Sequence, residues 1–388
     1  MLEKSDNLEN IHLSNETMGH AKAISEPQSS TSIQLFMVGT FPPPVHGMAA
    51  ATQAVFDRLV AEGWQVEKLD TAPNSLSRRV VARLGRFPAV LRVWWRLATA
   101  KWRNGETRPV AYIALSGGWG QIYDLVTVAI CRVRGLPCVL HHHSVAYLSK
   151  KSFITRLLCQ TAGLSTAAHI VLCEPMRQRL EALYEVRRVT VLSNSALFPL
   201  DSEPLEREAL RVVGFLSNVT REKGGECVIA LARAIRQRNW PLRVVVAGPC
   251  HDEHLVEALN ASAEEGILEW LGPVYGEDKS QFWKMTDVFV FPTQYANEAE
   301  PLVLWEALAA GVPVISYSRG CIASQLEFGG IALEPSEDFV EESLKTLADW
   351  QNPARFREVS EQARRRYAEA STTGVTAWVD FVQLLERG

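Results

Sequence analysis

The sequence lacks several features that would place it in particular protein classes. It has no run of about 18 uncharged apolar residues, so no transmembrane helix is predicted. The N-terminus has neither the basic start nor the apolar run of a signal peptide. The seven cysteines are scattered and include no Cys-x-x-Cys pair, which argues against a disulfide framework or a zinc site. Together these absences predict a protein of a reducing compartment, the cytoplasm.

The size and composition of the chain are those of an ordinary globular protein. Its 388 residues are too many for one compact core, so two domains are expected. The net charge of −4 gives no argument for nucleic acid as a partner. Residues 1–31 are rich in Ser, Asn, Glu and Gln and have little to bury, which predicts a disordered tail.

Short apolar runs that alternate with helical patterns predict two α/β domains with parallel sheets. The first set of strands is expected at Ile33–Val38, Val110–Leu115, Cys138–His142 and His169–Leu172. The second set is expected at Arg211–Leu216, Leu242–Ala247, Ile267–Leu271, Val288–Phe291 and Pro313–Ser316. We therefore expect Rossmann-like domains at 32–200 and 201–372 with a cleft between them, and a last helix at 373–388 that packs back on the first domain.

The segment 291–316 carries two carboxylates around a short helix. Pro301 suits a first helical position and Gly311 suits the residue just past the helix end. A helix N-terminus binds phosphate well, because its N–H groups are free and its dipole is positive there. Glu298 precedes this N-terminus, and Glu306 lies about one and a half turns into the helix. Carboxylates accept hydrogen bonds from sugar hydroxyls, so the segment predicts a site for a sugar nucleotide.

This segment resembles the Glu-(seven residues)-Glu signature of family 4, or group 1, retaining glycosyltransferases, which have the GT-B fold. The resemblance implies that Glu298 contacts a donor sugar hydroxyl and that Glu306 contacts the ribose. Leu302 and Val303 would offer backbone N–H groups to the phosphates. Glu300-Pro-Leu stands where the family often has Phe-Gly-Leu.

The loop within 213–225 resembles the family's strand–loop–helix that ends in Lys-Gly. Family members use an Arg and a Lys of this loop to neutralise the diphosphate leaving group. Lys223 matches the Lys, whereas Asn218 stands where the Arg is usual, and Arg221 is nearby but out of register. The second polar group is therefore either Arg221 or Asn218. The alternative is a solvated surface loop.

Two elements of the first domain complete the resemblance. The loop 39–47 follows the first strand and resembles the family's glycine-rich loop, with His46 in place of a glycine and Gly47 open to a ligand. His143 matches a histidine that approaches the donor sugar, and strand alternation places His141 on its side and His142 on the other. A metal bound by the three histidines is disfavoured because adjacent strand residues diverge.

Residues 78–103 are basic and rich in tryptophan. No Asp or Glu occurs between Thr71 and Gly105, while eight Lys and Arg residues give a local charge of +8. A basic amphipathic helix with tryptophans is typical of a surface that lies on anionic lipid. A helix packed with Trp inward and Arg outward would explain the pattern equally well.

These features predict a retaining GT-B glycosyltransferase that moves a sugar from a nucleotide-diphosphate sugar to a glycan or polyprenyl-linked acceptor in bacterial surface polysaccharide synthesis. No Asp-x-Asp occurs, so metal independence is expected, with Lys223 and helix dipoles as the positive groups. The alternatives are a GT-B nucleotide-sugar epimerase or phosphorylase, and a catalytically degenerate scaffold. We expect a cytoplasmic protein, peripheral on the inner face of the cell membrane if 78–103 binds lipid.

Overall fold

The computed structural model describes residues 34–43, 47–72, 86–101, 109–198 and 205–387. The predicted tail 1–31, His46 and parts of the basic segment 78–103 lie outside the described residues. Among the described residues, no helix has both the length and the apolar composition that a membrane crossing requires.

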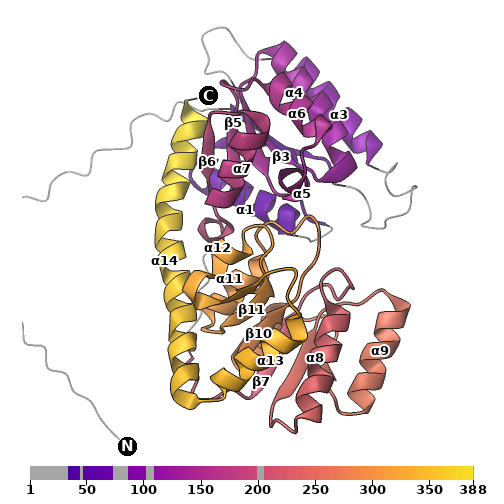
Figure 1. Ribbon diagram of the computed structural model, residues 1–388. Helices are drawn as coiled ribbons and strands as arrows, with labels where there is room; N and C mark the ends of the chain where they lie inside the picture. Colours follow the sequence, from indigo (N-terminus) through magenta and orange to yellow (C-terminus); the bar gives the residue numbers. More distant parts are fainter. Residues whose placement is uncertain (1–33, 44–46, 73–85, 102–108, 199–204, 388) are drawn as a thin grey trace, which may run out of the picture. The chain divides into compact units, whose positions relative to one another are not determined.

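The first domain is built on a sheet of parallel strands in the order β2-β1-β3-β4-β5-β6 (Figure 1). The strands are β1 (Gln34–Gly39), β2 (Gln65–Asp70), β3 (Val110–Leu115), β4 (Cys138–His142), β5 (Ala168–Val171) and β6 (Val189–Val191). The four predicted strands are confirmed. The prediction missed β2 and β6, because these edge strands are short or polar and bury little.

Helices cover both faces of this sheet. They are α1 (Gly47–Ala61), α3 (Phe87–Thr99), α4 (Gln121–Arg134), α5 (Ala146–Ser149), α6 (Phe153–Ala162) and α7 (Glu174–Tyr184), with the 3₁₀ turns η1 (Gly118–Gly120) and η2 (Asn194–Ala196). Helices α3, α4 and α6 share one core cluster with one side of the strands. Helix α1 packs in another cluster with the side chains that alternate to the opposite face.

The second domain repeats this plan with a parallel sheet in the order β12-β11-β10-β7-β8-β9. Its strands are β7 (Val212–Leu216), β8 (Arg243–Ala247), β9 (Glu269–Trp270), β10 (Val288–Phe291), β11 (Val314–Tyr317) and β12 (Gly330–Leu333). Its helices are α8 (Gly225–Gln237), α9 (Glu253–Glu264), α10 (Gly276–Met285), α11 (Leu302–Ala309), α12 (Ile322–Leu326) and α13 (Phe339–Trp350), with the turn η3 (Glu327–Gly329). The half-exposed edge strand β12 was not predicted.

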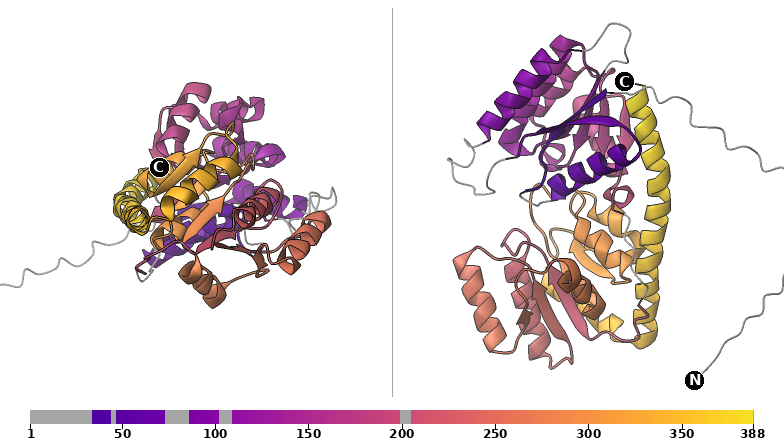
Figure 2. Two further views of the ribbon diagram at one scale, coloured as in Figure 1. Left: turned by 60° about the horizontal axis from the view of Figure 1, so that its bottom comes forward. Right: turned by 180° about the vertical axis from the view of Figure 1, so that it is seen from behind.

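The last helix, α14 (Pro353–Glu386), begins far earlier than the helix predicted at 373–388 (Figure 2). Its first half packs in the core of the second domain, for example through Phe356 and Ala363. Its last turns bury Trp378, Phe381 and Leu385 against β1, β3 and α1 of the first domain. The predicted return of the chain to the first domain is therefore confirmed.

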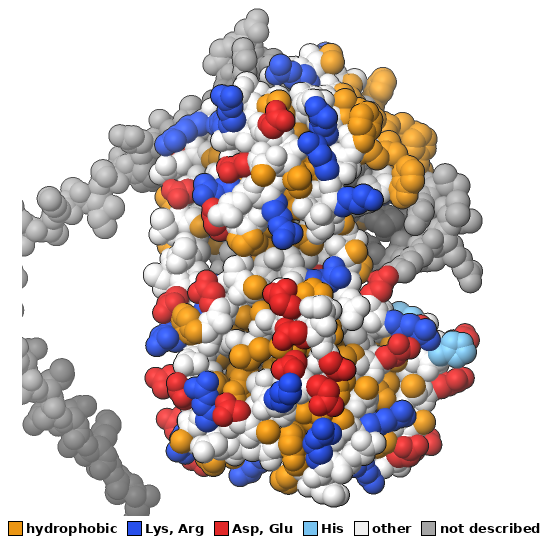
Figure 3. All heavy atoms as spheres, in the orientation of Figure 1, with side chains coloured by type: hydrophobic (Ala, Val, Ile, Leu, Met, Phe, Trp, Pro, Cys, Tyr) orange, Lys and Arg blue, Asp and Glu red, His pale blue; other side chains and the backbone are white. Residues whose placement is uncertain are grey.

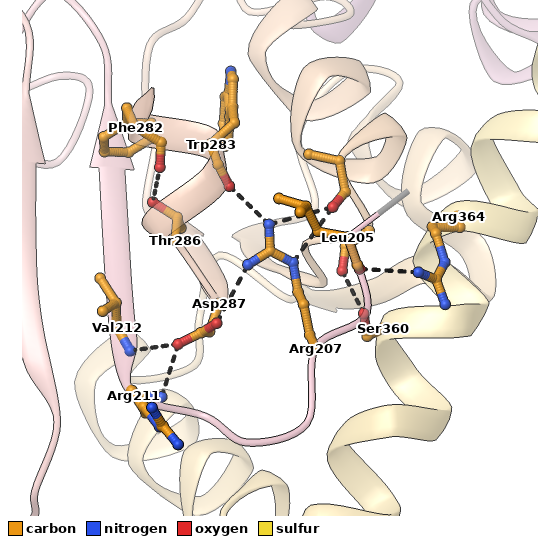
Figure 4. Close-up of polar contacts among 12 residues, drawn as sticks. Leu205, Arg207, Arg211, Val212, Phe282, Trp283, Thr286, Asp287, Ser360 and Arg364 are labelled. Carbon is orange, nitrogen blue, oxygen red and sulfur yellow. Dashed lines mark hydrogen bonds and ion pairs between the residues drawn. The ribbon is translucent and has the colours of Figure 1, made fainter. Parts of the chain in front are cut away.

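A buried arginine anchors the chain where it enters the second domain (Figure 4). Arg207 donates to the carbonyl of Trp283 at 2.7 Å and forms an ion pair with Asp287 at 3.3 Å. The other carboxylate oxygen of Asp287 accepts the N–H groups of Arg211 and Val212, both at 2.9 Å. This network joins the start of β7 to the loop between α10 and β10, so residues 207–212 are fixed to the second domain.

Two of the seven cysteines form a disulfide, although the scatter of the cysteines argued against a disulfide framework. Cys173 caps α7 in the first domain and Cys321 caps α12 in the second. Their Cα atoms lie 5.9 Å apart although 148 residues separate them along the chain. Spacing in the sequence gives no sign of this pair, because only the folded arrangement of both domains brings the two residues together.

Candidate active site

The structure brings together Glu298 and Lys223, which lie 75 residues apart in the sequence. Lys223 follows β7 and Glu298 follows β10, so both lie beyond the carboxyl ends of neighbouring strands. The ammonium of Lys223 forms an ion pair with Oε2 of Glu298, which also accepts the hydroxyl of Thr293 at 3.0 Å. The Glu298 side chain is buried and that of Lys223 is about a fifth exposed, so the pair is accessible mainly through Lys223.

Gly224 fixes the position of Lys223. It adopts a positive φ of 91°, and a Cβ atom there would lie 2.5 Å from the ring of Pro292 at the end of β10. Any side chain would therefore push the loop away from β10. Lys223 is held over two rings of the same region, 5.0 Å from the Tyr295 centroid and 5.4 Å from that of Phe291.

Glu306 lies in the fifth position of α11 and has its own partners. Its Oε1 atom accepts the ammonium of Lys279 at 2.7 Å, and its Oε2 atom accepts the indole N–H of Trp283 at 3.3 Å. Both partners come from α10. Two donors thus orient the carboxylate of Glu306. A ligand hydroxyl that binds this carboxylate would compete with the half-exposed Lys279 for its Oε1 atom.

Helix α11 begins one residue later than predicted. Pro301 is the N-cap, with φ −65° and ψ 125°, and not the first helical residue. Leu302 and Val303 form the first turn, where backbone N–H groups have no partner within the helix. Gly311 follows the helix end with a φ of 69°, as predicted.

Arg221 and Asn218, the two candidates for a second polar group on the Lys223 loop, have different surroundings. Arg221 forms ion pairs with Glu226 at 3.2 Å and Asp252 at 3.6 Å, so the structure does not bring it to the Glu298–Lys223 pair. Asn218 is exposed after the end of β7, beside the isolated bridge that Val219 makes with Cys250.

The histidines at the end of β4 alternate as predicted. The rings of His141 and His143 lie 4.0 Å apart, and His141 contacts the hydroxyl of Tyr112 at 2.5 Å. His142 lies on the other side, with Nε2 3.0 Å from Nδ1 of His169. Burial lowers the pKa of His141 and His142 well below its usual value, and lowers that of His169 to about 4. These three rings are therefore neutral near pH 7.

The remaining first-domain candidates lie at strand ends as well. His143 is half-buried and follows β4 directly. Gly47 is the exposed first residue of α1, and no atom lies within 4 Å of where its Cβ would be. Within the described parts of the chain, no three His, Cys, Asp or Glu side chains are grouped so that they could hold a metal ion.

Sequence reasoning did not predict the contacts that join the two domains beside Glu298. The hydroxyl of Ser144, one residue after His143, donates to Oδ1 of Asn297 at 2.8 Å. Gly117 packs so closely against Asn297 that a Cβ atom would lie 2.8 Å from Oδ1. Ser144 and Gly117 follow β4 and β3, so the carboxyl edge of the first sheet meets the Glu298 loop directly.

Glu300, which departs from the family pattern, is a buried link between the domains. Its carboxylate accepts the hydroxyl of Ser193 at 2.7 Å and the N–H of Asn194 at 2.6 Å. Its carbonyl accepts the side-chain amide of Asn194 at 2.9 Å. Burial raises the pKa of Glu300 to about 7, against the lowering effect of these hydrogen bonds. Nothing in the local sequence signals these partners, which lie 106 residues away.

We expect Glu300→Ala to lower the free energy of unfolding by about 2 kcal/mol, because it leaves the buried N–H of Asn194 without its partner. The folded protein holds a proton on Glu300 between the ordinary pKa of about 4.5 and the raised value of about 7. The contribution of this group to stability therefore falls by up to about 3 kcal/mol as the pH rises through that window.

Urea unfolding at several pH values measures both effects. Glu300→Gln keeps the shape of the side chain and should remove this part of the pH dependence, while Glu265→Gln at the exposed end of α9 should leave it unchanged. Parallel pH profiles for the wild type and Glu300→Gln would contradict the assignment.

Part of the chain matches a known protein family. Residues 200–364 match the model of the family described as "Glycosyl transferases group 1". The matched region contains Lys223, Glu298, Glu300 and Glu306. A curated relative, the D-rhamnosyltransferase WbpZ of Pseudomonas aeruginosa, is 27% identical over 146 residues, which are 37% of each chain. The family match is confined to the second domain, and the chain spans 37% of the length of this relative.

Solved structures with the same two-domain arrangement establish the GT-B fold. Sucrose-phosphate synthase of Thermosynechococcus elongatus superposes with a TM-score of 0.67 at 14% identity, covering 92% of this chain and 100% of that one. Anabaena HepE in complex with UDP superposes with a TM-score of 0.63 at 16% identity, covering 90% of this chain and 99% of that one. The expected fold class is thereby confirmed.

Proposed function

We propose that this protein is a retaining glycosyltransferase that transfers a sugar from a nucleotide-diphosphate sugar to a glycan or polyprenyl-linked acceptor. The observation that carries the proposal is the contact of Lys223 with buried Glu298, beside the N-terminus of α11. An isolated buried carboxylate would be costly, and here it is held by one cation and one hydroxyl. That arrangement leaves an anion and a cation together where a charged ligand would bind.

Each candidate residue has a role in this proposal. Lys223 and the first N–H groups of α11, at Leu302 and Val303, would neutralise the diphosphate as negative charge develops on it. Glu298 would accept a hydroxyl of the donor sugar, and Glu306 one of the ribose. Arrival of a phosphate would give Lys223 a second anionic partner and free one oxygen of Glu298 for the sugar.

The acceptor would approach from the first domain. His143 and Gly47 follow strands of that domain, and Ser144 ties its edge to the loop that carries Glu298. In a retaining reaction without a protein nucleophile, the acceptor oxygen attacks from the face that the phosphate leaves, and a phosphate oxygen takes its proton. Positive charge from Lys223 and α11 would serve without a resident metal.

The biological setting is part of the same proposal. HepE has been crystallised with UDP, and WbpZ is named as a rhamnosyltransferase, which supports a nucleotide-linked donor and a glycan product. We propose a role in bacterial surface polysaccharide synthesis on the cytoplasmic side of the membrane. The basic segment 78–103 would hold the enzyme at the anionic lipid surface.

A thermal-shift screen against UDP-, GDP- and ADP-sugars tests donor binding. At a ligand concentration of about 100 times Kd, the native state should gain about 2.7 kcal/mol and Tm should rise by several degrees for one nucleotide class. Glu306→Ala should weaken that binding about tenfold by removing a charged acceptor. Glu269→Ala, which removes an exposed ion pair with Arg243 in the same domain, is the matched control.

The same samples separate the rival functions. Release of the nucleotide diphosphate and a free sugar as the normal products, with no need for an acceptor, would identify an epimerase. A scaffold would bind no sugar nucleotide at all, and Glu298→Ala would then change nothing in cells. Either result would end the glycosyltransferase proposal.

A further inference from the structure

Helix α3 exposes a stripe of large apolar side chains. Its buried face consists of Val90, Val93 and Leu97. On the opposite face, Phe87, Leu91 and Trp95 follow one another at intervals of four residues, and Trp95 is 72% exposed. The stripe is therefore not the inward face of the helix. Trp94 is the tryptophan that packs inward, where its indole N–H donates to Thr127 of α4 at 3.0 Å.

The two neighbouring helices of the same layer repeat this pattern. On α4, Ile122 and Val133 are exposed at the two ends of one helix face, Val133 to 88%. On α6, Phe153 and Leu157 are exposed one turn apart, Phe153 to 80%. Figure 3 shows hydrophobic side chains gathered at the upper right, where Figure 1 places these helices. We call this surface of α3, α4 and α6 the three-helix face.

The charge around the three-helix face is one-sided. Among the described residues of 86–101 and 109–173, nine are Lys or Arg and one is acidic. Within the three helices the acidic residue is Asp124, which is buried and accepts the N–H of Ser116. Exposed Arg92 and Arg156 stand beside Leu91 and Leu157.

Positive charge interleaved with exposed aromatic and aliphatic side chains matches the interface of an anionic bilayer. Apolar side chains gain by leaving water for the acyl boundary, and each basic residue near the surface adds about 1 kcal/mol. A nucleic acid would not use the aliphatic side chains, and a purely acidic protein surface would leave them in water.

The three-helix face also adjoins the candidate active site. All strands of the first sheet are parallel, so the helices that follow them begin at its carboxyl edge. Phe87, Ile122 and Phe153 lie in the first turns of their helices, and exposed Trp119 lies just before α4. The same edge carries Ser144, which bonds to Asn297 next to Glu298.

We infer that the three-helix face docks on an anionic phospholipid bilayer and so presents the acceptor side of the site to the membrane. The inferred docking surface extends the proposed membrane contact of 78–103 to α4 and α6. The inference rests on the proposed function only in its assumption of a lipid-linked acceptor. Binding to the bilayer itself requires no sugar transfer.

Vesicle sedimentation of the full chain tests the inference. The probe is vesicles of phosphatidylglycerol and phosphatidylcholine in equal parts, with pure phosphatidylcholine as the neutral comparison. We expect strong pelleting with the anionic vesicles alone, reduced by salt. Phe153→Ser/Leu157→Ser, which lies outside 78–103, should weaken binding at least tenfold.

A matched control comes from the opposite side of the first domain. Val375 and Val379 are exposed at the same spacing on α14, which packs on the other face of the sheet. Val375→Ser/Val379→Ser should pellet like the wild type. Circular dichroism melts of both double variants, and their thermal shifts with sugar nucleotides, separate loss of lipid binding from loss of fold or of the donor site.

Three results would overturn the inference. They are equal pelleting of the α6 variant and the wild type, equal binding to neutral vesicles, and no vesicle binding together with a dimer in analytical ultracentrifugation that the α6 variant dissociates. The last result would assign the three-helix face to a second copy of the chain. Donor binding can persist in all three cases, so this failure is distinct from failure of the proposed function.

Discussion

Replacing Lys223 by Ala is expected to lower kcat/KM for turnover of the sugar nucleotide by about 10²–10³-fold. The loss should lie mainly in kcat, because the negative charge on the leaving diphosphate develops in the transition state and Lys223 is the cation placed to meet it. Glu298→Ala should produce a loss of similar size by removing the acceptor for the donor sugar. Steady-state kinetics with the donor found by thermal shift gives both values.

The ion pair predicts that the losses of activity in the two single variants are not additive in the double variant. Because Lys223 and Glu298 contact each other, the combined loss in Lys223→Ala/Glu298→Ala should be smaller than the two single losses together. Lys345→Ala is the matched control, since it breaks a Lys–Glu pair with Glu342 in the same domain that is exposed and far along the chain. If Lys223→Ala behaves like Lys345→Ala, Lys223 has no part in the chemistry.

The local structure around the predicted donor side followed from the sequence because its residues lie close together in the chain. The helix start, Glu306 and the residue after the helix end lie within 301–311, so their relative positions follow from helix geometry, whereas Glu298 lies in the loop before the helix. Strands buried on both faces, such as β3 and β10, were found because each is an unbroken apolar run. Edge strands such as β2 carry no such run.

The contacts between the domains could not be predicted in this way. Glu300 looked like a local departure from the family, and its partners Ser193 and Asn194 are known only once both domains have folded. The same holds for the contact of Asn297 with Ser144 and for the ion pairs that hold Arg221 at Glu226 and Asp252. Each depends on loop conformation, which periodicity and propensity leave open.

The disulfide should have a large effect on stability. Oxidised wild type is expected to unfold at a higher guanidinium concentration than the reduced protein, with a difference of about 4 kcal/mol, because a bond between Cys173 and Cys321 closes a loop of 148 residues in the unfolded chain. Cys321→Ser should match the reduced wild type and lose its response to dithiothreitol. Cys250→Ser, at a half-buried free cysteine of the second domain, should keep that response.

The bond also bears on the donor loop. The N–H of Cys321 donates to the carbonyl of Ala299 at 2.7 Å, so the disulfide ties the residue next to Glu298 to the first domain. Asn297 and Glu300 make the further ties on either side. If opening of the two domains limits product release, reduction should raise kcat several-fold without changing donor affinity.

A disulfide is uncommon in the expected reducing compartment, so alkylation of the protein in intact cells, followed by mass spectrometry, decides which state functions there. Stability and kcat that do not respond to dithiothreitol would show that the two cysteines do not form the bond.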